Sequence, residues 1–166
     1  MLKSFAITLL STITLLNIFA CEKIPDQVSV NTHEEQNENQ NNNGSTMPET
    51  INITISGKSL PVKIEDNVAT KALVEALREA SITYEARDYG GFEKVGQLGH
   101  TLPSNDTQMT TQAGDVILYS SNQIVLFYGS NSWSYTRIGK IQYGSMDELK
   151  DFLKVGEGKI YVTISL

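Results

Sequence analysis

The sequence predicts a mainly β fold, a closed or nearly closed β-barrel of about eight strands with two short α-helices. Apolar residues alternate with polar ones in several short segments, which is the period of a half-buried strand. Two further segments near the middle are apolar on both faces, as in strands that are covered on both sides. Only two stretches have a helical period. A closed barrel also leaves the last strand paired instead of exposed at a sheet edge.

The folded part begins with a predicted β-hairpin. Residues 51–56 alternate isoleucine with Asn, Thr and Ser, and residues 60–65 alternate Leu, Val and Ile with Pro, Lys and Glu. The Gly-Lys-Ser stretch between them supplies the turn. Residues 67–80 then repeat alanine and leucine at helical spacing, with Asp66 or Asn67 as N-cap, so one amphipathic helix follows the hairpin.

The middle of the chain supplies the predicted central strands. Residues 81–99 indicate two short strands around a turn at Gly90 and Gly91, and residues 100–114 indicate a long polar loop. The segments DVILY, at 115–119, and QIVLFYG, at 123–129, are apolar on both faces. They are expected to lie between other layers of the fold.

The C-terminal part adds two strands and a helix. Residues 129–141 form one predicted strand, and residues 144–153 form a short helix in which Ser145 and Glu148 have the spacing of a capping box. The chain closes with KIYVTISL, at 159–166, which alternates apolar and polar residues as a strand does.

The N-terminus has the features of a secretory signal. Lys3 precedes a long apolar run diluted by Ser and Thr, which ends at Ala20 just before Cys21. The stretch NIFAC resembles a bacterial lipoprotein signal, which implies a leader at 1–20 and lipid attachment to Cys21. The alternatives are an uncleaved membrane helix, for which the clean apolar run is short, and a plain secretory signal. Cys21 is the only cysteine in the chain, so it serves no intramolecular disulfide.

Three segments are therefore expected. A signal peptide at 1–20 is followed at 21–48 by a tether rich in Asn, Gln and Glu, which buries too little apolar surface to order itself. One globular domain occupies 49–166. The expected location is the bacterial cell envelope, at the outer membrane or periplasmic face, with the membrane as partner through the N-terminal lipid.

The stretch GSNSWSYTRIGKI contains the only tryptophan and is the first candidate for a binding site. Strand alternation places Trp133, Tyr135 and Arg137 on one face. A buried guanidinium without a partner costs several kcal/mol. Arg137 therefore either pairs with a carboxylate while the aromatic rings fill a barrel end, or lines a partly open pocket with them. The sequence leaves both accounts open.

The order of these elements resembles the bacterial cyclophilin-like domain family. The motifs GDVILY and SYTRIG carry most of the resemblance, which extends over 51–166. It implies a cyclophilin-type barrel of about eight strands with helices at its ends. True cyclophilins are prolyl isomerases that bind proline peptides in a groove on the barrel wall, whereas members of this group mostly have no established activity.

The isomerase motif is incomplete in this sequence. No Phe-Met-x-Gln run is present, and the domain's only histidine, His100, comes too early in the chain. Arg87 and Phe92 are near the strands that correspond to the first part of the cyclophilin site. Gln123 and Phe127 are near the strand that corresponds to its Gln-Phe-Phe segment. The candidate ligand-binding residues are therefore Gln123, Phe127, Trp133, Tyr135 and Arg137.

Composition argues against several other chemistries. One histidine and no cysteine in the domain do not make a zinc site, and no Gly-x-Ser-x-Gly elbow is present, so we expect no metal and no cofactor. A net charge of −6 without a basic patch argues against nucleic acid. The expected function is a non-catalytic module that binds a peptide or small molecule. The alternatives are a divergent prolyl isomerase acting on envelope proteins and an interaction domain of a larger lipoprotein assembly.

Overall fold

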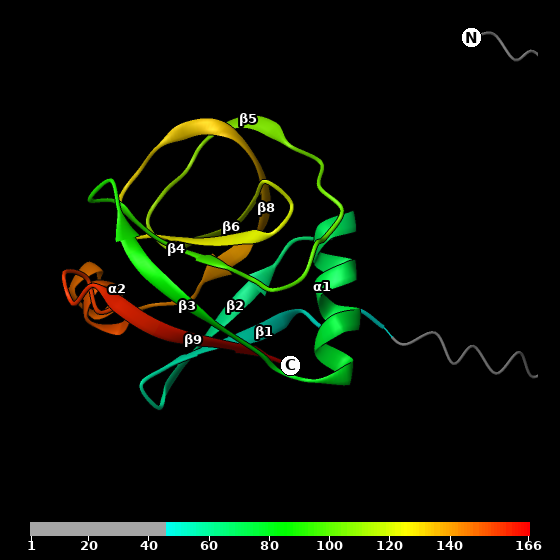
Figure 1. Cartoon of the computed structure of the whole chain (residues 1–166), viewed down its shortest axis with the longest axis horizontal. Coiled ribbons are helices and arrows are strands. Elements are labelled where there is room, and N and C mark those ends of the chain that lie inside the picture. Colours follow the sequence, from blue (N-terminus) through cyan, green and yellow to red (C-terminus); the bar gives the residue numbers. More distant parts are fainter. Residues whose placement is uncertain (1–45) are drawn as a thin grey trace, which may run out of the picture. The chain divides into compact units, whose positions relative to one another are not determined.

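The computed structural model describes residues 46–166 (Figure 1). The predicted signal peptide, the lipid attachment at Cys21 and the predicted tether up to residue 45 lie outside the described residues. Within residues 46–166, no helix is both long and apolar enough to cross a membrane.

The described part of the chain is a closed antiparallel β-barrel. Eight strands form a ring in the order β2-β1-β9-β3-β4-β7-β6-β8, which the pairing of β2 with β8 closes. The predicted fold class is thus confirmed. The ring consists of β1 (Thr50–Ile55), β2 (Lys58–Ile64), β3 (Ile82–Tyr89), β4 (Glu93–Gln97), β6 (Asp115–Tyr119), β7 (Gln123–Phe127), β8 (Ser132–Ile141) and β9 (Lys159–Ser165).

Ring closure depends on a glycine. Gly139 in β8 lies opposite Ile64 in β2. A Cβ atom at Gly139 would collide with the backbone oxygen of Lys63. The absence of a side chain therefore lets the first hairpin approach β8 closely enough to complete the barrel.

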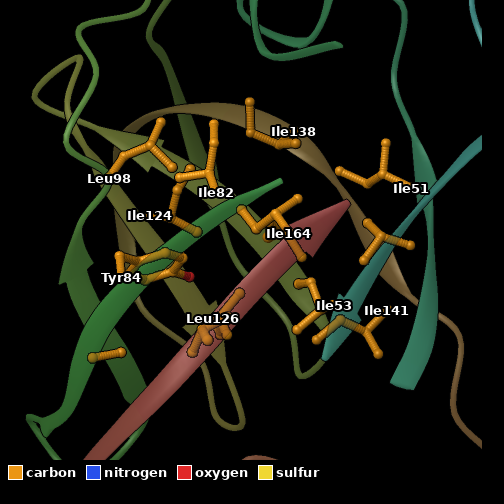
Figure 2. Packing of buried hydrophobic residues seen from close by; sticks show 14 of the residues in the cluster. Ile51, Ile53, Ile82, Tyr84, Leu98, Ile124, Leu126, Ile138, Ile141 and Ile164 are labelled. Carbon is orange, nitrogen blue, oxygen red and sulfur yellow. The ribbon is translucent and has the colours of Figure 1, made fainter. Parts of the chain in front are cut away.

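The barrel interior is the main hydrophobic core (Figure 2). Seven of the eight ring strands contribute apolar side chains from one face to it, as the alternation in the sequence predicts, and β4 is the exception. Isoleucines dominate, and most are completely buried. Those drawn in Figure 2 include Ile51, Ile53, Ile124, Ile138 and Ile164.

Two helices pack onto this core. Helix α1 (Val68–Glu79) begins after Asn67, whose side chain accepts a hydrogen bond from the backbone N–H of Thr70, so Asn67 is the N-cap. Helix α2 (Met146–Phe152) begins after Ser145, whose hydroxyl accepts from Glu148 N–H. The Glu148 carboxylate accepts from Gly144 N–H, one residue before the usual partner in a capping box.

The predicted loop at 100–114 is wrong in one part, because it contains a strand, β5 (Thr107–Thr110). This strand is polar and mostly exposed, so its sequence has no hydrophobic period to reveal it. It pairs with the first half of β8. Figure 1 shows β5 and this half of β8 arching over β4 and β6.

Candidate functional site

A second apolar cluster lies on the face of the sheet that points away from the barrel interior. Its buried members are Ile117 on β6, Val125 and Phe127 on β7, and Tyr135 on β8. Because β6 and β7 contribute one face to this cluster and the other to the barrel core, both of their faces are apolar. The arch of β5 and β8 covers this outer cluster.

A cavity of about 340 Å³ opens beside the outer cluster. We call it the Trp133 cavity. Four aromatic side chains line it, Tyr89, Tyr119, Trp133 and Tyr135. Trp133 is 56% exposed and Tyr89 is 68% exposed, so both lie toward solvent. Tyr135 is only 5% exposed and lies deeper. The ring of Tyr135 meets that of Tyr119 edge to face at 5.8 Å between centroids.

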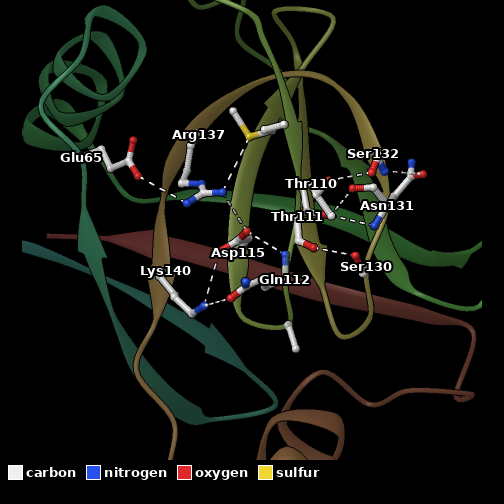
Figure 3. Close-up of polar contacts among 12 residues, drawn as sticks. Glu65, Thr110, Thr111, Gln112, Asp115, Ser130, Asn131, Ser132, Arg137 and Lys140 are labelled. Atoms are coloured by element: carbon white, nitrogen blue, oxygen red, sulfur yellow. Dashed lines mark hydrogen bonds and ion pairs between the residues drawn. The ribbon is translucent and has the colours of Figure 1, made fainter.

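The wall that carries Trp133 is fixed by hydrogen bonds between two segments (Figure 3). Thr111 exchanges hydrogen bonds with the backbone of Asn131, and the Ser130 hydroxyl donates to the carbonyl oxygen of Thr111 at 2.7 Å. The Asn131 amide in turn donates to the Tyr135 hydroxyl at 2.9 Å. The backbone that precedes Trp133 and the Tyr135 hydroxyl are therefore held in place before any ligand arrives.

Among residues 46–166, Glu93 is the one carboxyl group on the lining of the Trp133 cavity. The residue is 6% exposed, and its Oε2 atom is buried without a hydrogen-bond partner. Burial raises the pKa of Glu93 from 4.5 to about 7. A buried polar atom without a partner in a folded protein needs an explanation, and a ligand that supplies the partner is one.

The remaining lining groups are two valines and two amides. Val95 and Val125 come from neighbouring strands β4 and β7, where they face each other in register, and Gln123 and Asn131 supply the amide groups. An apolar cavity with a few converging polar groups is the usual composition of a small-molecule site.

Arg137 belongs to a different arrangement (Figure 3). Its guanidinium lies 3.2 Å from the carboxylate of Asp115, which is 1% exposed, and 3.8 Å from that of Glu65. Asp115 also accepts a hydrogen bond from Gln112 N–H and lies 3.8 Å from the Lys140 amine. Of the two accounts of Arg137, the structure shows the pairing with a carboxylate.

The structure thus brings together three of the five residues singled out from the sequence. Gln123, Trp133 and Tyr135 line the Trp133 cavity. Phe127 is completely buried beneath it and contacts the Tyr135 ring edge to face at 5.9 Å. Within the described residues, Arg137 is not part of the cavity lining.

Six lining residues were not singled out from the sequence: Tyr89, Glu93, Val95, Tyr119, Val125 and Asn131. Glu93 lies opposite Phe127 in the register of β4 and β7. Paired residues in an antiparallel ladder point to the same face. The apolar outer face of β7 is therefore the one sequence signal from which the burial of Glu93, on the neighbouring strand β4, could have been predicted.

Arg87 lines a more open groove that adjoins the cavity and shares Val95 and Gln123 with it. The Arg87 guanidinium pairs with Glu85 at 2.7 Å and is mostly exposed. His100 is exposed, and the lining of neither the cavity nor this groove includes it within the described residues. Among residues 46–166, no group of three or more His, Cys, Asp or Glu side chains is placed to hold a metal ion.

Comparisons with known proteins agree with this architecture. A family model described as the cyclophilin-like family matches residues 53–165. The solution structure of a hypothetical protein from Archaeoglobus fulgidus superposes with a TM-score of 0.50 and 16% identity, covering 74% of this chain and 98% of that one. At this identity the likeness concerns the fold alone. No curated protein is significantly similar to the chain.

Proposed function

The chain belongs to the cyclophilin-like family, and we propose that its barrel is a non-catalytic module that binds a small molecule or a peptide in the Trp133 cavity. The observation that carries this proposal is the cavity itself, which combines a lining of four aromatic side chains with a buried carboxyl group whose Oε2 atom lacks a hydrogen-bond partner. Core packing alone does not explain the open volume, because a close-packed core leaves few voids, and the carboxyl oxygen of Glu93 lacks the hydrogen-bond partner that most buried polar atoms have.

Trp133 provides a direct test, because it is the only tryptophan in the chain and lies at the cavity. Its fluorescence reports on this site alone. A library of small molecules and short peptides is titrated while Trp133 emission and backbone amide NMR signals are followed. We expect a ligand to change the emission and to shift the amide signals of Val125 and Asn131. A library in which no compound perturbs these signals would contradict the proposal.

The second candidate is a divergent prolyl isomerase. The groove beside the cavity favours it, because Arg87 and Gln123 line one surface there, as the resemblance to cyclophilins suggests. Against it, Arg87 is paired with Glu85 and His100 lies elsewhere. Exchange measurements on a proline tetrapeptide distinguish the two functions, since uncatalysed isomerisation takes tens of seconds or longer. We expect no acceleration, and an acceleration that Arg87→Ala abolishes would establish the isomerase.

We further propose that the module is held at the bacterial cell envelope by a lipid on Cys21, on the outer membrane or periplasmic face. The sequence NIFAC before the tether supports this proposal. Cys21→Ser removes the only sulfur in the chain that a lipoprotein signal could use. We expect labelled palmitate to be incorporated into the wild type and not into the variant, and only the wild type to fractionate with membranes. An unlabelled, soluble wild type would contradict the anchor.

A further inference from the structure

The chemistry of the Trp133 cavity favours a particular class of ligand. Aromatic side chains from four segments of the chain meet there: Tyr89 from β3, Tyr119 from β6, and Trp133 and Tyr135 from β8 present their rings along the lining, and the Phe127 ring lies beneath. The face of an aromatic ring carries negative electrostatic potential, so it attracts a cation that lies within about 6 Å of its centre.

The charge of the lining has the same sign as the ring faces. Glu93 is the charged side chain on it, and within the described residues the lining includes neither lysine nor arginine. The Oε2 atom of Glu93 has no hydrogen-bond partner and is shielded from solvent. Burial destabilises an ionised carboxylate in such a place, and the approach of a positive charge offsets this cost.

We propose that the Trp133 cavity binds an organic ammonium group, with the cation held between the aromatic rings and the carboxylate of Glu93. This inference rests on the proposed function, because it names the ligand of the same site. The volume of about 340 Å³ lies at the small end of the range for ligand pockets, which suits a compact amine or the end of one lysine side chain.

Other ligand classes fit the lining less well. An anion would meet the Glu93 carboxyl, which repels it when ionised, and among the described residues the lining offers it only neutral donors. These donors are the amides of Gln123 and Asn131, the tyrosine hydroxyls and the Trp133 indole N–H, and Asn131 already donates to Tyr135. A neutral ligand can donate a hydrogen bond to Glu93, but it supplies no countercharge for an ionised carboxylate and no cation for the aromatic rings. A cation is the class that satisfies the aromatic faces and the carboxylate together.

Binding of a cation is expected to depend on pH through Glu93. The titratable groups around this carboxyl are mostly tyrosines: Tyr89 from β3, Tyr119 from β6, Tyr135 from β8, and Tyr128 just after β7. On the opposite face of β4, Lys94 is paired with Asp88 at 2.8 Å. Burial holds the pKa of Tyr128 at about 12 and raises that of Tyr135, so neither titrates between pH 5 and 8. Loss of affinity on acidification in this range therefore reports on Glu93.

The experiment compares two ligands of the same shape. Choline carries a quaternary ammonium group, and 3,3-dimethylbutan-1-ol is its neutral carbon analogue. Each is titrated into the full-length protein at pH 8 while Trp133 fluorescence and amide NMR signals are followed. We expect choline to bind at least tenfold more tightly than the neutral analogue, and its affinity to fall at least tenfold between pH 8 and pH 5.

Two variants assign the effect to Glu93. Glu93→Gln keeps the size of the side chain and removes its charge, so choline should bind at least tenfold more weakly while the neutral analogue is unaffected. Glu79→Gln removes the same charge from the exposed end of α1 and should leave both affinities unchanged. Amide spectra of both variants that match the wild type show that the fold is intact.

A second arm distinguishes a free amine from one carried by a polypeptide. A capped tripeptide with a central lysine is compared with n-butylamine, which presents the same ammonium group alone. Tighter binding of the tripeptide identifies a lysine side chain as the source, and equal binding identifies a free amine. Both outcomes support an ammonium ligand.

The outcomes that overturn the inference differ from those that overturn the proposed function. If neutral or anionic compounds bind in the cavity as tightly as choline, or if Glu93→Gln does not weaken choline binding, the ammonium site is excluded and the binding module remains. If no compound of any charge perturbs Trp133, both proposals fail.

Discussion

Two acidic residues begin neighbouring parts of the same barrel wall, yet they have opposite surroundings. Asp115 is the first residue of β6 and Glu93 the first residue of β4, and both are at least nine-tenths buried. The Oδ2 atom of Asp115 has Arg137 at 3.2 Å and a backbone N–H at 2.9 Å, whereas its Oδ1 atom accepts no hydrogen bond and has only the Lys140 amine at 3.8 Å. The carboxylate of Asp115 thus has two cations beside it. Glu93 has an unpartnered oxygen that lines a cavity with aromatic walls.

This difference separates a structural acid from a candidate binding acid. A buried carboxylate whose countercharge is part of the fold stabilises the arrangement of its own strands. A buried carboxyl whose countercharge is missing destabilises the free protein and becomes favourable only when a ligand supplies the charge. Strained or unsatisfied groups of this kind concentrate at functional sites.

The largest effect is expected from removing the countercharge of Asp115. Arg137→Met keeps most of the side-chain stem and leaves Asp115 buried without its closest cation. We expect a loss of about 3 kcal/mol in the free energy of unfolding, measured by urea denaturation. Binding at the Trp133 cavity should be retained, because Arg137 is not part of that lining within the described residues.

Lys140→Met is the matched control. Its amine lies 3.8 Å from Asp115 and the side chain is 42% exposed, so we expect a loss below about 1 kcal/mol. If Arg137→Met costs as little as Lys140→Met and instead abolishes ligand binding, Arg137 belongs to the binding site and the contrast between the two acids is wrong.

Glu93→Gln should have the next largest effect, and only above acidic pH. Because the pKa of Glu93 is raised in the folded protein from 4.5 to about 7, folding favours its protonated form. The stability that this provides is fully present below about pH 4.5 and is lost as the pH rises through about 7. The amide in Glu93→Gln does not ionise, so the variant avoids this loss.

The stability of Glu93→Gln relative to wild type should therefore increase by about 2 to 3 kcal/mol between pH 4.5 and pH 8. Urea denaturation at several pH values measures the free energy of unfolding of each protein. The other titratable groups are the same in both proteins, so their contributions cancel in the difference. Glu79→Gln should show no such trend, since that residue is exposed. A flat difference for Glu93→Gln would mean that its carboxyl is solvated or paired in solution.

The smallest effect on stability is expected at the mouth of the cavity. Trp133→Ala removes a ring that is more than half exposed, so the free energy of unfolding should change by less than about 1 kcal/mol. Ligand affinity, followed by NMR, should fall by at least tenfold because the ring forms part of the binding wall. Tyr161→Ala, an equally exposed aromatic residue on β9, is the control and should leave affinity unchanged.

A loss of several kcal/mol in Trp133→Ala would instead show that the ring closes the outer cluster as part of the core. The aromatic side chains around Glu93 would then stabilise the fold, as the ion pairs of Asp115 do. The proposed contrast between a structural site at Asp115 and a binding site at Glu93 would no longer hold.

Strong local patterns made most of the fold predictable. The alternating isoleucines of β1, the period of α1 and the two apolar strands β6 and β7 each carry a signal of their own. Strand β5 has no such signal, because it is mostly polar and exposed and its place depends on its pairing with β8. It pairs with the part of β8 that carries Trp133 and Tyr135, so the setting of these two lining residues was as hard to predict as the strand.

The candidate site was predictable only in part, and for a physical reason. Sequence patterns identified three lining residues: Trp133 as the only tryptophan, Tyr135 by strand alternation with it, and Gln123 through the resemblance to cyclophilins. No such pattern identified Glu93, because a glutamate beside a turn is ordinarily exposed. Its burial results from the register that pairs it with Phe127, which is a tertiary property. Arg137 was grouped with the aromatic residues by strand alternation, whereas its actual partner comes from β6.

The pKa of the Glu93 carboxyl group, measured by ¹³C NMR in the free protein and in the presence of saturating choline, tests the central claim most directly. The account predicts a value near 7 without ligand, because the buried group lacks a countercharge, and a value well below that with the cation bound. A value near the ordinary 4.5 in the free protein, or one that choline leaves unchanged, would contradict it.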